Sequence, residues 1–174
     1  MLLLSLMLTP RPAAAETPPR YQALLTAVRA QGDIIPEIGQ ADQTDQDQML
    51  CMALNIYHEI RGGTSRDQWA VGFVTLNRTH HDAFKADTVC DVVWSPGQFS
   101  WTRWPLRAQV PHEKAAWIES QHKAVLLLSG EKMNDPTDGS TFFYQARLNF
   151  SWTRRLVNKI RIGAHVFASL PGGR

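Results

Sequence analysis

The chain has 174 residues, the length of one domain with short extensions. Hydrophobic residues make up 44% and charged residues 20%, which is typical of a globular protein with an adequate core. The formal net charge of +2 is too small to favour a nucleic-acid partner or strong steering toward a polyanion. Recognition must therefore depend on local groups.

The N-terminus begins with a short apolar segment, residues 2–8, followed by Thr9-Pro10 and three alanines at 13–15. An apolar segment before an Ala-x-Ala site is typical of a secretory signal peptide. The sequence thus predicts a signal peptide over 1–15, cleavage after Ala15 and export to the periplasm or cell envelope. The segment is too short to span a bilayer, so no transmembrane anchor is expected. The alternative is a disordered or anchoring tail.

Residues 16–46 are expected to form a mobile extension or linker, with one short helix over 20–30. The stretch 39–48 is rich in Gln and Asp and poor in apolar residues, a composition that does not favour a packed structure. The main domain is expected over 47–170.

A helix is predicted to begin at the capping-box pair Thr44 and Asp47 and to stop at Gly62-Gly63. Glu59 lies in its last turn. Projection at about 100° per residue places three mostly apolar side chains on the same stripe: Met52, Asn55 and Ile56.

Glu59 is the strongest candidate for a catalytic residue. A carboxylate on an apolar stripe is poorly solvated, which raises its pKa and prepares it to act as a general acid. The alternative is that Glu59 only forms a salt bridge with Arg61 or Arg66.

Cys51 and Cys90 are the two cysteines of the chain. An even number in an exported protein permits one disulfide, which would join the start of the Glu59 helix to the segment before an aromatic loop. Closing a loop of about 40 residues would contribute about 4 kcal/mol in the chain-entropy model. The alternative is two buried free thiols.

Two further helices are predicted. Ser65 caps the first, on which Trp69, Phe73 and Leu76 share a face. The second runs over 111–128 and ends at Gly130. Trp69 and Trp117 are expected in the core.

Between these helices, Pro96-Gly97 leads into a loop of alternating polar and aromatic residues. Aromatic rings in a groove bind the apolar faces of sugars while sugar hydroxyls stay hydrogen-bonded. The loop is therefore a predicted substrate-binding element, with ordinary packing as the alternative. Its candidate residues are Gln98, Phe99, Ser100 and Trp101.

Strands are predicted over 141–144 and over 159–167, the latter turning at Gly163 into a hairpin. The predicted fold class is therefore mainly helical α+β with a short β-hairpin.

Five segments resemble, in the same order, those of one known family. The run Asn55-Ile56-Tyr57-His58-Glu59-Ile60-Arg61-Gly62 resembles the catalytic signature of the cell wall hydrolases named after the spore cortex-lytic enzyme SleB. Other segments resemble the family's second helix, its next segment, its aromatic loop and its closing strand: residues 69–78, 88–94, 98–102 and 162–167.

The resemblance implies a small lysozyme-like or lytic-transglycosylase-like domain, with Glu59 at a helix end facing a groove and peptidoglycan glycan strands as substrate. Two positions and one segment depart from the family pattern. Ile60 stands where the family usually has Ala, and Gly63 stands where it usually has a second acid. Residues 142–146 lack the histidines that commonly surround an aromatic there.

Glycosidic cleavage needs a proton donor for the leaving oxygen and stabilisation of an oxocarbenium-like carbon. No second acid stands at a paired spacing. One acid fits a lytic transglycosylase cleaving between N-acetylmuramic acid and N-acetylglucosamine, in which Glu59 donates a proton and then deprotonates the sugar's 6-hydroxyl. Hydrolysis by water is the nearby alternative. The other acids considered are expected on solvated faces: Asp67, Asp91, Glu113 and Glu119.

Supporting roles are predicted for residues outside the helix. Gln98 and Ser100 could hydrogen-bond N-acetyl or hydroxyl groups, Trp101 could stack on a sugar, and Tyr144 could hold an oxygen near the scissile bond.

Two other functions are weighed. A zinc amidase needs a second His four residues after the first, and His58 and His112 have Gly62 and Ala116 there. No metal or cofactor is therefore expected. The second is an inactive wall-binding module, which the Gly63 departure keeps open.

Overall fold

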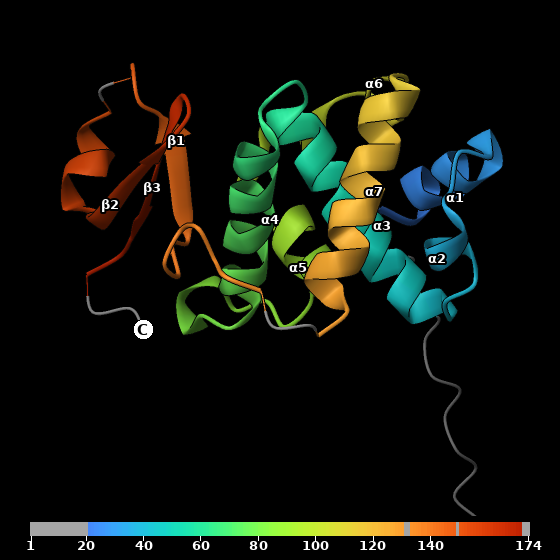
Figure 1. Cartoon of the computed structure of the whole chain (residues 1–174), viewed down its shortest axis with the longest axis horizontal. Coiled ribbons are helices and arrows are strands. Elements are labelled where there is room, and N and C mark those ends of the chain that lie inside the picture. The colour runs from blue at the N-terminus through green and yellow to red at the C-terminus, as the bar shows by residue number, and fades with distance from the viewer. Residues whose placement is uncertain (1–20, 131–132, 149, 172–174) are drawn as a thin grey trace, which may run out of the picture.

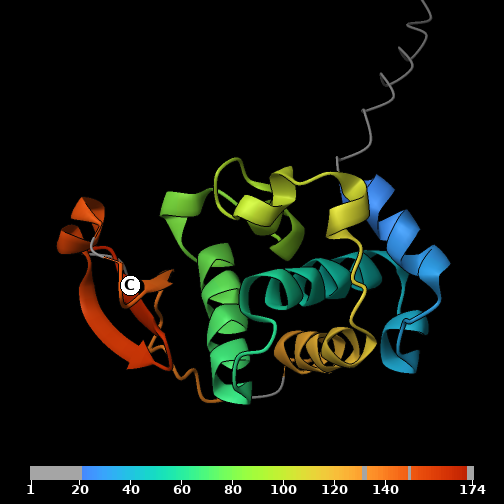
Figure 2. The same ribbon diagram turned by 90° about the horizontal axis from the view of Figure 1, so that it is seen from above.

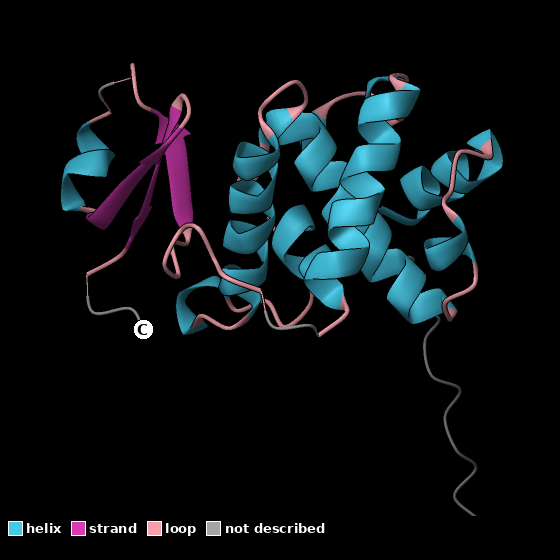
Figure 3. Ribbon diagram, viewed as in Figure 1, coloured by secondary structure: helices cyan, strands magenta, loops and turns pink. Residues whose placement is uncertain are grey.

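The structure, a computed structural model, describes residues 21–130, 133–148 and 150–171. Helices build one side of the molecule and a small sheet builds the other (Figures 1 and 3). The predicted signal peptide and its cleavage site lie outside the described residues.

The helices are α1 (Tyr21–Gln31), α2 (Pro36–Gly39), α3 (Gln43–Ile60), α4 (Ser65–Thr79), α5 (Val89–Trp94), α6 (Leu106–Gln109) and α7 (Lys114–Leu128). Three 3-10 turns are η1 (Asp82–Phe84), η2 (Ser100–Arg103) and η3 (Ser151–Arg155). The strands are β1 (Phe142–Gln145), β2 (Val157–Ile162) and β3 (His165–Ser169).

Helix α3 is the centre of the helical side. It is surrounded by α4, α5 and α7, and Figure 2 shows its C-terminal end directed at the flank of α4. The helix starts two residues earlier than the predicted capping box, because the Asp42 carboxylate accepts the Asp45 N–H. It ends at Ile60, and Gly62 follows with a φ of 81°, a left-handed conformation that favours glycine.

Residues 21–46 belong to the packed domain, contrary to the expectation of a mobile linker. Leu24 and Leu25 of α1 and Ile38 of α2 have no exposed surface. The Ile35 N–H donates to the buried Gln121 side chain of α7 at 3.0 Å. These apolar residues all precede the polar stretch 39–48, whose composition alone suggested a linker.

Helix α4 begins with a capping box, one residue before the predicted cap. The Thr64 side chain accepts the Asp67 N–H, and the Asp67 carboxylate accepts the Thr64 N–H at 2.8 Å. Asp67 is therefore buried, not on the solvated face expected for it. A Cβ at Gly163 would overlap the Asp67 Oδ1 atom, so the β2–β3 turn sits directly on the start of α4.

The sheet is antiparallel with strand order β1-β3-β2. The predicted hairpin is present, and its turn contains Gly163 with a φ of 53°. The predicted strand at 141–144 appears as β1 and pairs with β3, which places Phe142 opposite Ala168. The mainly helical α+β fold is thus confirmed, with a third strand beside the hairpin.

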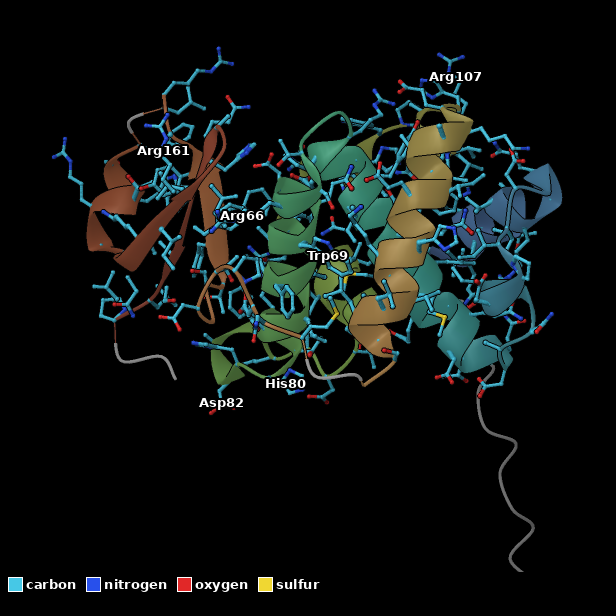
Figure 4. All side chains as sticks on the ribbon, in the orientation of Figure 1. Arg66, Trp69, His80, Asp82, Arg107 and Arg161 are labelled. Carbon is cyan, nitrogen blue, oxygen red and sulfur yellow. A yellow bond between two sulfur atoms is a disulfide. The ribbon has the colours of Figure 1, made fainter. Side chains whose placement is uncertain are left out.

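The space between elements is filled by side chains (Figure 4). Trp117 is buried as predicted, and Trp69 is partly buried between α4 and α7, with the Lys123 ammonium 5.8 Å from its ring. The predicted disulfide joins Cys51 of α3 to Cys90 of α5. Among the described helices, none combines the length and apolarity that crossing a bilayer requires.

Candidate active site

Glu59 lies in the last turn of α3 and is partly buried. Burial raises the pKa of its carboxyl to about 7, while the positive charge of Arg78 opposes this rise. At neutral pH a carboxyl with this pKa is populated in both its protonated and its ionised form. This suits a group that first donates a proton and then accepts one.

Among the described residues, Glu59 forms a salt bridge with neither Arg61 nor Arg66, the alternative considered for it. Arg61 instead pairs with Glu113 at 3.3 Å and lies over the Tyr57 ring. Arg66 is exposed on α4 and forms no ion pair with Glu59. The Glu59 carboxyl therefore remains available for other chemistry.

One helical turn before Glu59, a buried network fixes the position of this part of α3. The Asn55 amide donates to Thr75 Oγ1 of α4 at 2.9 Å, and its carbonyl accepts the Trp101 indole N–H at 3.0 Å. All three side chains are buried, so each hydrogen bond satisfies a group that has no water to replace it. The network holds the Glu59 helix against α4 and the aromatic loop.

The structure places the two aromatic residues of the loop in the core, against the prediction of an open sugar-binding surface. Trp101 is 1% exposed and Phe99 is 3% exposed. The Trp101 ring stacks on His58 with centroids 4.6 Å apart. Only Gln98 and Ser100 of the predicted loop residues are exposed. Tyr144 lies on β1, partly buried, on the other side of the molecule.

Arg78 is a site residue that the sequence analysis missed. It is 5% exposed, its Nε–H donates to the Thr141 carbonyl at 2.8 Å, and its Nη1 has no partner in the described structure. The guanidinium lies 5.0 Å from the rings of both Phe84 and Phe99 and 5.8 Å from that of Phe142.

Arg78 and Glu59 act on each other through space rather than through a contact. Burial lowers the pKa of Arg78 to about 10, and the Glu59 charge partly restores it. Helical spacing could have predicted that Arg78 is buried, because it shares one stripe of α4 with Val71 and Val74, and this stripe is buried in the structure.

His58 is a neutral structural residue. Burial lowers its pKa to about 4. Its Nε2 lies 2.7 Å from the Gln109 carbonyl, which can only accept, so Nε2 carries the proton and donates. Across the described parts of the chain, no group of three or more His, Cys, Asp or Glu is arranged to hold a metal ion.

The acids considered as partners of Glu59 are engaged elsewhere. Asp67 caps α4, and Glu113 pairs with Arg61. Asp91 is exposed and accepts the Thr88 hydroxyl, while Glu119 accepts the Lys123 ammonium at 2.6 Å.

The departures at Ile60 and Gly63 are explained together. A Cβ at Gly63 would lie 2.8 Å from Cγ1 of Ile60, 3.0 Å from the Ile60 carbonyl oxygen and 3.2 Å from Cβ of Asp67. Alanine has no Cγ1, so the larger side chain at position 60 occupies the space that a side chain at position 63 would need. The glycine is thus the residue that fits beside Ile60.

Comparison with known proteins adds a family relation. A family model described as Cell Wall Hydrolase matches residues 62–168. The chain is 32% identical over 133 residues to the spore cortex-lytic enzyme of Halalkalibacterium halodurans, covering 74% of this chain and 36% of that protein. It is 27% identical over 136 residues to the spore cortex-lytic enzyme of Oceanobacillus iheyensis, covering 76% and 45%. The chain therefore spans less than half the length of these relatives.

Two solved structures share the fold. The catalytic domain of SleB from Bacillus cereus has a TM-score of 0.57 and 23% identity, covering 78% of this chain and 98% of that domain. The catalytic domain of the germination-specific lytic transglycosylase SleB from Bacillus anthracis has a TM-score of 0.57 and 25% identity, covering 78% and 100%.

Proposed function

Because the chain belongs to the cell wall hydrolase family, we propose that it cleaves peptidoglycan glycan strands between N-acetylmuramic acid and N-acetylglucosamine as a lytic transglycosylase. The observation that carries the proposal is Glu59, a partly buried carboxyl at the end of α3 with a pKa of about 7. The acids considered as its partners are engaged elsewhere.

In the first step, protonated Glu59 donates its proton to the glycosidic oxygen, and the bond to the anomeric carbon breaks. The substrate's N-acetyl group can stabilise the positive charge that develops on this carbon. Glu59 is then a carboxylate, and the nearby Arg78 cation favours that form. The developing negative charge is thus stabilised without a direct ion pair.

In the second step, Glu59 accepts the proton of the sugar's 6-hydroxyl, whose oxygen attacks the anomeric carbon and closes a 1,6-anhydro ring. The proton gained by the leaving sugar equals the proton returned to Glu59, so the enzyme ends in its starting form. Attack by water in place of the 6-hydroxyl would give hydrolysis at the same site.

Substrate contacts are proposed at three of the residues that reach the surface. Gln98 is exposed on the loop before η2 and Ser100 is exposed at the start of η2, where they can hydrogen-bond sugar hydroxyl or N-acetyl groups. Tyr144 on β1 is partly buried, and we propose that its hydroxyl contacts the substrate from the sheet side.

We further propose that the protein acts outside the cytoplasm, in the periplasm or cell envelope. The Cys51–Cys90 disulfide supports this, because such bonds persist in oxidising compartments.

The test compares turbidity loss of purified peptidoglycan with the wild type, Glu59→Gln and a matched control, Glu113→Gln. Glu113 is exposed and pairs with Arg61, so its replacement should leave activity near wild type. Loss of a positioned acid should lower the rate at least about 10²- to 10⁴-fold in Glu59→Gln. Activity that EDTA abolishes would support a metal amidase, and a wild type that binds without cleaving would support a wall-binding module.

A further inference from the structure

The sheet side carries exposed aromatic rings that the mechanism above does not use. Trp152 is 44% exposed and Phe150 is 43% exposed, both at η3. Their rings are nearly parallel, with an angle of 18° between planes and centroids 6.0 Å apart. Large apolar rings are costly to leave in water, so their joint exposure indicates a contact surface.

The Trp152 indole is held in place from beneath. Tyr144 meets it at 74° with centroids 5.7 Å apart, and Phe142 at 51° with centroids 6.3 Å apart. Phe142 and Tyr144 alternate along β1 and therefore project from the same face of the strand. A ring supported in this way loses little conformational freedom when a ligand binds.

These rings lead back to the neighbourhood of Glu59. Phe142 lies 5.8 Å from the Arg78 guanidinium, and Arg78 lies close enough to Glu59 to shift its pKa. In Figure 1, β1 is the strand beside α4, with η3 farther out on the sheet side. The aromatic row thus runs from Arg78, whose charge acts on Glu59, to the surface.

We propose that Phe142, Tyr144, Phe150 and Trp152 form a sugar-binding platform that holds an N-acetylated sugar of the glycan strand beside the cleavage site. The proposal rests on the function proposed above. Phe142 joins these rings to Arg78, beside the proposed cleavage site. This continuity favours a glycan over a second copy of the chain as the ligand. Aromatic faces take up the apolar face of a sugar while the sugar's hydroxyls remain in water.

The test measures binding without cleavage, by calorimetry of Glu59→Gln protein with chitotetraose. Adding Trp152→Ala should weaken binding at least about tenfold, because the upper face of the platform is removed. Trp152→Phe should retain most of the affinity. The matched control is Leu126→Ala, since Leu126 is 41% exposed on α7 and should leave affinity unchanged.

The platform is refuted if Trp152→Ala binds within about twofold of its parent, or if the parent binds no chitotetraose. A concentration-dependent dimer that Trp152→Ala abolishes, with sugar affinity unchanged, would assign the rings to self-association instead. Should Trp152→Ala unfold, Phe150→Ala replaces it with the same expected loss. If wild-type protein cleaves no peptidoglycan while Trp152→Ala loses affinity, the platform stands and only the proposed catalysis fails.

Discussion

The two sides of the molecule use their aromatic residues in opposite ways. On the helical side, Trp101 is 1% exposed and its indole N–H is hydrogen-bonded to Asn55. On the sheet side, Trp152 is 44% exposed and rests on other rings. The first arrangement fixes the helix that carries Glu59, and the second leaves a ring face open to a ligand. A tryptophan near a turn is therefore not by itself a sign of binding.

The largest expected effect separates these two tryptophans by stability. Trp101→Ala should destabilise the protein by about 3–5 kcal/mol, because it leaves a cavity and an unpaired Asn55 carbonyl. Trp152→Ala should lower the free energy of unfolding by only about 1–2 kcal/mol, because the ring is half exposed and loses only its contacts with neighbouring rings. Urea denaturation of both variants checks this. Equal destabilisation would remove the distinction between a structural and a binding tryptophan.

A second expected effect concerns Glu59 and pH. Its folded pKa of about 7 exceeds the ordinary value of 4.5, so between these pH values the folded state binds more protons than the unfolded state. Stability should therefore fall as pH rises through this window. Glu59→Gln removes the penalty and should stabilise the protein by about 1–3 kcal/mol at pH 8.

At pH 4 the same variant should show little gain, because Glu59 is protonated in both states. Denaturant unfolding of wild type and variant at the two pH values gives the comparison. A variant that is less stable than wild type at pH 8 would show that the Glu59 charge serves the fold rather than the site.

The smallest expected effect is the coupling energy between Ile60 and Gly63, at the turn between α3 and α4. Gly63→Glu should destabilise the protein by about 1–3 kcal/mol through crowding against Ile60. Combining it with Ile60→Ala should cost less than the sum of the single changes by about 0.5 kcal/mol or more. Chemical denaturation of the four proteins measures the coupling. Strict additivity of Gly63→Glu and Ile60→Ala would contradict the steric explanation.

Local patterns were sufficient to predict the elements that glycines and apolar periodicity define. These include the Glu59 helix ending before Gly62 and the hairpin at Gly163. The even cysteine count separately predicted the Cys51–Cys90 pairing. The position of Glu59 on an apolar stripe also indicated its raised pKa.

The remaining features depend on contacts between distant segments. Trp101 is buried because Asn55, far from it in the sequence, accepts its N–H. The surroundings of Arg78 are formed by the rings of Phe84, Phe99 and Phe142, which come from three separate segments of the chain. The packing of α1 and α2 likewise depends on contacts with distant residues, such as the hydrogen bond from Ile35 to Gln121 of α7.

The most direct test of Glu59 as the single acid and base is mass spectrometry of peptidoglycan digested in H₂¹⁸O. The mechanism predicts 1,6-anhydro ends without ¹⁸O from wild type, and at least about a 10²-fold loss of these products from Glu59→Gln. Reducing ends that carry ¹⁸O would show hydrolysis by water. Anhydro products formed by Glu59→Gln at the wild-type rate would contradict the central claim that Glu59 moves the proton.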